Sequence, residues 1–350
     1  MKDDEDLLVD LNDEAEGGER QAGRRRALCI GIDTYPTAPL RGCVADARLW
    51  QQTLKQLGFE TRIMLNEEAK WAKIIEALTD LVKNSRSGDV VVLQYSGHGT
   101  TVPDASGDDV GGNNVREDEA LCPHDFATGK LVIDDDVARI FRGLPPGINL
   151  TCFFDCCHSG SITRFAIGNT PQNPLGGPDE RPRFIQPDAK LIAAHLKFRE
   201  KQGGTRATSL RGPEGMREVV FSACLDREVA WESNGQGDFT RLALPILRQA
   251  VNGWTNEAFA QAVTRAFGAT PRQHPELDCA PSARRNGFLK PLSVKAVEAP
   301  TGDADTSAVL PDVSILLGGG GGGGQPDGTS EREAIAQILT GLASLLRPRK

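Results

Sequence analysis

The chain has 350 residues, of which 39% are hydrophobic and 25% charged, with a formal net charge of −8. This is the composition of a globular protein, and its acidity disfavours general binding to nucleic acid or to anionic membranes, which needs a basic surface. No apolar run approaches the roughly 18 residues of a membrane span, and the acidic start shows no signal-peptide pattern. The 8 cysteines are therefore expected to be free thiols, and we predict a cytoplasmic location.

Along the chain, residues 1–23 are dominated by acidic side chains, which favours a disordered tail over a docking element. From residue 24, short apolar segments alternate with helical patterns. The predicted strands cover 26–33, 59–65, 89–95, 148–154 and 218–224, and the predicted helices cover 44–57 and 71–82. Strands that are apolar throughout and alternate with helices predict an α/β fold with a mostly parallel sheet covered on both faces.

Two segments interrupt this alternation. Residues 162–215 are rich in Gly, Pro and Arg around a weak helical pattern at 189–201, which indicates a long insertion loop. Residues 298–330 include the glycine run 318–324 and read as a flexible linker. After it, 331–350 carries an apolar helical stripe. Such a short amphipathic helix needs its own domain, a second copy or a partner to pack against.

Reactive residues follow two of the predicted strands. One strand runs into Ser96-Gly-His98-Gly99, the other into Asp155-Cys156-Cys157-His158. Ligand-binding and catalytic groups of open α/β sheets collect beyond the carboxyl ends of strands. An imidazole can activate a thiol, and backbone N–H groups beside glycines can stabilise an oxyanion. Each residue alone is more often structural, but the pair predicts nucleophilic catalysis.

Metal binding is the alternative for the crowded Cys156, Cys157 and His158. Adjacent residues of an extended segment point to opposite faces, and no CxxC or HxxxH spacing completes a site. We therefore disfavour it.

Several blocks together resemble the caspase-like cysteine peptidases, and among them the metacaspases and bacterial caspase homologues. The blocks are Leu40-Arg-Gly-Cys-Val-Ala-Asp-Ala47, Ser96-Gly-His-Gly99, Asp155-Cys-Cys-His-Ser-Gly160, and Phe221-Ser-Ala-Cys224 with Gly237-Asp-Phe-Thr240. The resemblance covers roughly residues 25–292. It implies a caspase–hemoglobinase-like three-layer sandwich, with one peptidase domain over 24–297.

The resemblance also implies the catalytic roles. His98 would be the general base and acid, and Cys157 the nucleophile. Cys156 lies at the variable position of the motif, and His158 is not the dyad histidine. The backbone N–H groups of Gly99 and Cys157 would form the oxyanion hole. The implied enzyme is a thiol endopeptidase that works through an acyl-enzyme and requires no cofactor for its chemistry.

The substrate pocket implied by the resemblance consists of Cys43, Asp46, Ser96 and Asp155. Two carboxylates in a partly desolvated pocket suit a guanidinium, so we predict cleavage of proteins or peptides after Arg or Lys. Specificity for Asp or Asn is disfavoured because an acidic side chain would be repelled. The alternative class is a catalytically silent scaffold, which would need neither the dyad nor the acidic pocket.

Calcium activation, known for many metacaspases, is the open part of the resemblance. Asp118, Asp134 and Asp135 match three ligand positions, whereas Arg164 stands at the fourth and would weaken or abolish the site. The alternative is that residues 134–136 cap a helix over 137–141. Because the loop 162–215 is basic, an Arg-specific enzyme could process itself there. We expect a monomer, with the terminal helix available to a partner.

Overall fold

The structure is a computed structural model that describes residues 23–103, 117–157, 179–202, 216–226 and 228–292. The expected acidic tail up to residue 22, the glycine-rich linker and the terminal helix lie outside these residues. The described elements all fall within the predicted peptidase domain.

A six-stranded sheet forms the centre of the molecule, in the order β12-β9-β7-β3-β1-β2. All neighbouring strands are parallel except β12, which runs antiparallel to β9 at one edge. The strands are β1 (Arg25–Gly31), β2 (Glu60–Leu65), β3 (Val90–Ser96), β7 (Asn149–Asp155), β9 (Glu218–Ser222) and β12 (Glu276–Asp278). Every residue of β3 is buried, as its unbroken apolar run predicts.

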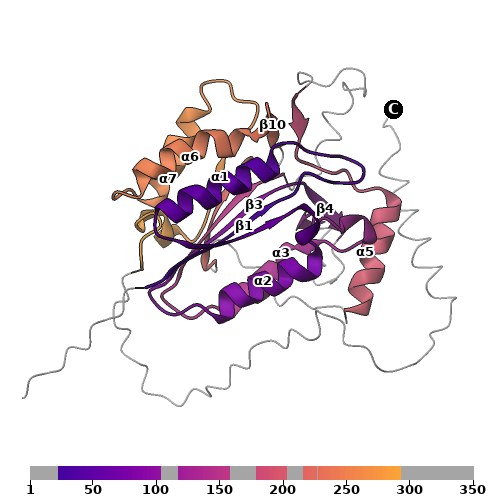
Figure 1. The fold of residues 1–350 in the computed structure, drawn as a ribbon, viewed down its shortest axis with the longest axis horizontal. Helices are drawn as coiled ribbons and strands as arrows, with labels where there is room; N and C mark the ends of the chain where they lie inside the picture. The colour runs from indigo at the N-terminus through magenta and orange to yellow at the C-terminus, as the bar shows by residue number, and fades with distance from the viewer. Residues whose placement is uncertain (1–22, 104–116, 158–178, 203–215, 227, 293–350) are drawn as a thin grey trace, which may run out of the picture.

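Helices cover both faces of this sheet, which confirms the predicted three-layer α/β fold (Figure 1). One face carries α1 (Cys43–Gln56), α6 (Asp238–Ala250) and α7 (Asn256–Ala266), and the other carries α2 (Trp71–Lys83) and α3 (Asp134–Arg142). Side chains alternate between the faces along each strand, so the core divides into two clusters. Val91 and Leu93 belong to the cluster with α2, whereas Val90 and Val92 belong to the cluster with α1.

Smaller elements surround the ends of the central strands. One small antiparallel sheet consists of β4 (Gly99–Pro103), β5 (Glu117–Leu121) and β6 (Val132–Ile133). A second consists of β8 (Arg181–Pro182), β10 (Trp231–Ser233) and β11 (Gln236–Gly237). The short 3-10 helices are η1 (Asn66–Glu68), η2 (Phe126–Thr128) and η4 (Pro281–Arg285). The helical pattern inside the insertion is confirmed as α5 (Ala189–Lys201). Buried Arg199 fastens α5 to α3 through two hydrogen bonds to Asp136, of 2.9 and 2.6 Å.

The aspartates 134–136 are not helix caps, so that prediction is wrong. Helix α3 begins at Asp134, its N-cap residue is Ile133, and no side chain caps it. The three acids form the first helical turn, where their charge interacts favourably with the helix dipole.

All eight cysteines are buried and free, which confirms the expectation of free thiols. In the described part of the chain, no helix combines the length and the apolar character needed to cross a bilayer.

Candidate active site

The two residues predicted to be catalytic lie at the same edge of the central sheet. Strands β3 and β7 are parallel neighbours, with Ser96 paired to Asp155 at their carboxyl ends. His98 and Cys157 each follow two residues after these strand ends and are 1% and 0% exposed. The sheet thus brings an imidazole and a thiol to one buried edge.

The ring of His98 is held in a defined orientation. Its Nε2 lies 2.7 Å from the carbonyl oxygen of Ala38, which accepts only, so Nε2 carries the proton and Nδ1 keeps its lone pair. Tyr35 packs on the ring with a centroid separation of 4.6 Å and accepts the His98 backbone N–H at 3.1 Å. Burial, together with the nearby Arg183 charge, lowers the pKa of His98 to about 4. The imidazole is therefore neutral at pH 7, as a general base must be.

The backbone N–H groups of Gly99 and Cys157 donate to one acceptor, the carbonyl oxygen of Arg183, at 3.1 and 3.3 Å. These are the two donors predicted for the oxyanion hole. The Cys157 thiol itself donates to the carbonyl oxygen of Glu228. Cys156 belongs to the core cluster on the opposite face of the sheet, and burial raises its pKa far above the ordinary value. Of the two adjacent cysteines, Cys157 is the one whose backbone N–H donates to the Arg183 carbonyl oxygen that Gly99 also contacts.

The side chain of Arg183 fills the predicted acidic pocket and is fully buried. Its Nη2 lies 2.6 Å from Asp46 Oδ2, and its Nη1 lies 3.0 Å from Asp155 Oδ1. A third carboxylate, Glu232, lies 3.4 Å from Nη2. The two predicted pocket acids, Asp46 and Asp155, therefore bind the same guanidinium, which belongs to Arg183 of the chain itself.

The other two predicted pocket residues lie beside these acids. Burial raises the pKa of Cys43 far above its ordinary value although Arg183 opposes this, so the thiol is neutral. Ser96 pairs with Asp155 across the strands, but its Oγ accepts a hydrogen bond from Gln94 at 2.8 Å. Cys43 and Ser96 thus furnish neutral walls.

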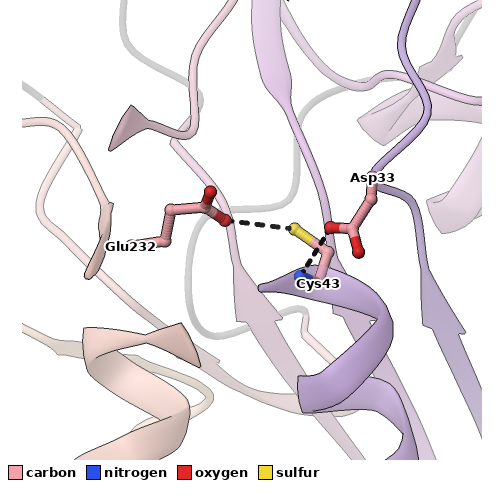
Figure 2. A group of neighbouring side chains, drawn as sticks. All are labelled: Asp33, Cys43 and Glu232. Carbon is pink, nitrogen blue, oxygen red and sulfur yellow. Dashed lines mark hydrogen bonds between the residues drawn. The ribbon is translucent and has the colours of Figure 1, made fainter. Parts of the chain in front are cut away.

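Glu232 is held in place at the start of α1. Its carboxylate accepts the backbone N–H groups of Arg41 at 2.8 Å and Gly42 at 3.1 Å. Figure 2 shows Cys43 between Glu232 and Asp33, and Asp33 Oδ1 accepts the Cys43 N–H at 2.8 Å. Among the described residues this is the only group of metal-ligating side chains with ligand atoms within 4.8 Å. Its carboxylates already satisfy helix-start donors and its thiol is neutral, so it forms a rigid pocket base rather than a metal site.

Gly237 forms a wall of the pocket. Its N–H donates to Asp46 at 3.1 Å. A Cβ at this position would lie 2.2 Å from Asp155 Oδ2 and 2.5 Å from Arg183 Nη1. Only glycine therefore leaves room for the guanidinium. Asp155 is fixed from the same side, because its Oδ2 accepts from the N–H and hydroxyl of Thr240 at 3.0 and 2.7 Å.

Around Arg183 the main chain is bound as an extended peptide. Strand β8 pairs antiparallel with β10, and the Arg183 N–H donates to Ala230 O at 2.8 Å. On the other side of Arg183, the Ile185 N–H donates to Gly99 O at 3.0 Å. The chain therefore enters and leaves the site through backbone hydrogen bonds, with the Arg183 carbonyl at the two N–H donors.

Sequence reasoning missed Arg183, Glu232 and Gly237 as parts of the site. Arg183 was one of many arginines and lysines in the insertion, and Glu232 was an isolated acid in a segment too short to show a period. Gly237 belongs to the motif block Gly237-Asp-Phe-Thr240, but the motif alone assigns this glycine no function.

The predicted calcium ligands do not form a ready site. Asp118 lies in β5, and Asp134 and Asp135 begin α3. Lost hydration and the charges of Asp135 and Glu119 raise the pKa of Asp134 to about 7. The carboxylates crowd one another electrostatically, but their oxygen atoms are not gathered within 4.8 Å in the described part of the chain. The geometry does not fit a bound Ca²⁺. Arg164 and His158 lie outside the described residues.

Comparison with known proteins places the chain among the metacaspases. Residues 25–165 match the family described as metacaspase, peptidase C14 domain. Metacaspase-1A of Aspergillus niger is 36% identical over 263 residues, which cover 70% of this chain and 64% of that protein. Metacaspase-1 of Emericella nidulans is 29% identical over 276 residues, which cover 73% and 65%. The chain thus spans less than two thirds of either relative.

A crystal structure of a Geobacter sulfurreducens protein shares the fold. It superposes with a TM-score of 0.60 at 24% identity, covering 77% of this chain and 99% of that one.

Proposed function

Because the chain belongs to the metacaspase-type, caspase-like family of cysteine peptidases, we propose that it is an endopeptidase that cleaves after arginine or lysine. One observation supports the proposal, namely how Arg183 is bound. Its guanidinium makes ion pairs with Asp46 and Asp155. Its carbonyl oxygen accepts hydrogen bonds from the backbone N–H groups of Gly99 and Cys157. A peptide with a basic residue before the cleaved bond would bind in the same way.

The proposed reaction starts when the Cys157 thiol turns from the Glu228 carbonyl towards the bound peptide carbonyl. The thiol proton passes to Nδ1 of His98, and Sγ bonds to the carbonyl carbon. The negative charge that develops on oxygen is held by the Gly99 and Cys157 N–H groups, a kind of donor worth about 10²–10³ in rate. His98 then protonates the leaving amine as the C–N bond breaks. Water, activated by the neutral imidazole, hydrolyses the thioester and restores the thiol.

We propose that the first substrate is the chain itself, at the bond between Arg183 and Phe184. This bond lies in the predicted self-processing loop, and its carbonyl occupies the proposed oxyanion hole. Until it is cut, the same segment blocks the pocket for other substrates.

Calcium activation stays a prediction of the resemblance alone. Asp118, Asp134 and Asp135 supply hard oxygen ligands of the type that Ca²⁺ prefers, but they would have to move to bind it. We derive no catalytic step from it. The cytoplasmic location and the monomeric state likewise stay predictions, the former supported by eight free thiols.

The proposal is tested by incubating the full chain and its Cys157→Ala variant, with Ca²⁺ or with a chelator. We expect the wild type to split into two fragments whose masses place the cut after Arg183, and the variant to stay intact. Fluorogenic peptides ending in Arg should be hydrolysed and those ending in Asp should not. If the chelator prevents both reactions, calcium is required.

A matched pair of arginines controls the site of cleavage. Arg183→Gln should prevent the cut, while Arg181→Gln, two residues away and with its side chain 28% exposed, should leave it in place. A wild-type chain that stays intact and hydrolyses no Arg peptide, with Ca²⁺ present, would favour the catalytically silent scaffold. Hydrolysis of Asp peptides would overturn the pocket assignment.

A further inference from the structure

We propose that Arg272 forms a second specificity site, which selects an acidic residue at the fourth position before the cleaved bond. This inference rests on the proposed function, because it takes the bound segment around Arg183 as a guide to how substrates lie. Counting back from Arg183, the fourth position is Glu180, which precedes β8.

Glu180 makes an ion pair with Arg272. Arg272 Nη1 lies 3.0 Å from Glu180 Oε1, and both side chains are about one third exposed, at 32% and 31%. Arg272 comes from the loop before β12, so it belongs to the enzyme body rather than to the bound segment. A substrate bound in trans would meet the same guanidinium edge.

The guanidinium of Arg272 is oriented before any substrate arrives. Its Nε and Nη2 donate to Asp238 Oδ2 at 2.9 and 2.6 Å, and Nη2 also bonds Ser233. Its Cζ lies 5.1 Å from the ring centroid of Trp231. Because Asp238 and Ser233 hold the other edge, Nη1 remains directed at the substrate. Little side-chain entropy is then lost on binding.

The charge balance at this position favours an acid. Asp238 is shared between Arg272 and Arg241, whose Nη2 lies 3.1 Å from Asp238 Oδ1. Two cations and one anion leave one net positive charge facing the bound segment. An acidic substrate side chain neutralises it, whereas a lysine would be repelled.

The loop that carries Arg272 is also fixed to the strand that binds the substrate backbone. Gln273 is fully buried, and its Oε1 accepts the Trp231 N–H at 2.9 Å, while its Nε2 donates to Ala223 O at 2.9 Å. The distance between the two specificity sites is therefore set by the fold. The enzyme would read a pattern of acid, two intervening residues, and arginine.

The test uses three peptides that copy the chain's own segment, acetyl-Asp-Xaa-Arg-Pro-Arg-coumarin with Glu, Gln or Lys as Xaa. The enzymes are the self-processed full chain and a full-length Glu180→Ala/Arg183→Ala variant, which lacks both side chains of the segment that contact Arg272 and the acidic pocket. We expect kcat/KM for the Glu peptide to exceed that of the Gln peptide by about threefold, the scale of a partly exposed ion pair. The Lys peptide should be slower still.

The difference should appear in KM rather than in kcat, because the contact is the same in the bound substrate and in the transition state. It should shrink in high salt, which screens exposed charges. Arg272→Gln should abolish the preference while the Gln peptide is still cleaved. Arg241→Gln is the matched control: it also removes an arginine from Asp238, but one without a contact to Glu180, and it should keep the preference.

Equal kcat/KM for the three peptides would overturn the second site while leaving the Arg-specific peptidase intact. The same holds if Arg272→Gln keeps the full preference for Glu. Failure to cleave any of the peptides would instead overturn the peptidase proposal itself, and the site with it.

Discussion

At the scale of single residues, Arg183 stands out because one buried guanidinium meets three buried carboxylates. Breaking a buried ion pair by removing one partner typically costs about 3–5 kcal/mol, since the remaining charge keeps its desolvation penalty. Burial and Asp155 raise the pKa of Asp46 to about 7, and Arg183 is the main influence that lowers it. The chain's own arginine therefore stabilises the pocket as well as occupying it.

We predict that Arg183→Ala destabilises the chain by about 3–5 kcal/mol and creates a binding site for a free guanidinium. Agmatine should raise the melting temperature of this variant, because a ligand that binds only the folded state stabilises it. All three proteins are compared in the uncut Cys157→Ala background, and agmatine should not affect the background protein, whose pocket Arg183 fills. Arg181→Ala, whose Nε lies 3.9 Å from Glu232 Oε1, is the control and should show no response. An equal response in all three proteins would contradict the pocket assignment.

The same variant should have a distinctive pH dependence. Without Arg183, the pKa of Asp46 in the folded state should rise above its present value of about 7. The folded state then binds more protons than the unfolded state, so its stability falls as pH rises through neutrality. Urea unfolding at pH 6 and pH 8 should show a larger deficit relative to wild type at pH 8. A deficit independent of pH would count against a buried Asp46.

Much of the site, but not its occupant, can be predicted from residues alone. His98, Cys157, Asp46 and Asp155 carry motif signals, and each follows a strand or begins a helix whose period is visible. Glu232 reaches the pocket from a three-residue strand. The pairing of Arg183 with Asp46 joins residues 137 positions apart. Such long-range pairings depend on the tertiary fold and leave no local pattern.

At the scale of elements, the sequence predicts most of the central strands and the helices α1, α2 and α5, but not the helices α6 and α7, of 13 and 11 residues. Strands β1, β2, β3, β7 and β9 and helices α1, α2 and α5 lie within a few residues of their predicted bounds. The small sheets β4-β5-β6 and β11-β10-β8 were not predicted. Strands β6, β8, β10 and β11 have two or three residues, too few to show alternation. Yet β8 is part of the substrate-like segment and β10 binds it, so the least predictable elements bear on the proposed specificity.

The junction of β11 and α6 gives a prediction at this scale. Gly237→Ala should lower kcat/KM for Arg peptides by about 100-fold, the cost of displacing a substrate by about 1 Å. The added Cβ would intrude between Asp155 and the guanidinium. Gly235→Ala, in the turn just before β11, is the control: its φ of +73° makes alanine strained, but a Cβ there would approach only Arg41 O, at 3.9 Å. It should cost about 1 kcal/mol of stability and spare the activity. Comparable activity losses in both variants would indicate general disruption of the turn.

At the scale of the whole molecule, a cut after Arg183 divides the chain through the middle of its central sheet. Strands β1 to β7 fall in the first fragment, and β9 and β12 in the second. The fragments share the parallel pair β7–β9, and the rings of Phe153 and Phe221 stack across it at 5.2 Å. Trp50 of α1 donates to Thr240 of α6 at 3.1 Å. The cut therefore breaks one buried peptide bond, between Arg183 and Phe184, while the β7–β9 interface persists.

We predict that the cut chain remains a single folded particle. On size-exclusion chromatography the two fragments should elute together at the volume of the uncut Cys157→Ala variant, and they should separate only in denaturant. Burial of the β7–β9 pair and of two aromatic faces outweighs the connectivity lost at one bond. The buried Arg199–Asp136 pair also holds α5, which follows the cut, against α3 of the first fragment. Separate elution of the fragments under native conditions would show that the Arg183–Phe184 connection is needed to keep the sheet together.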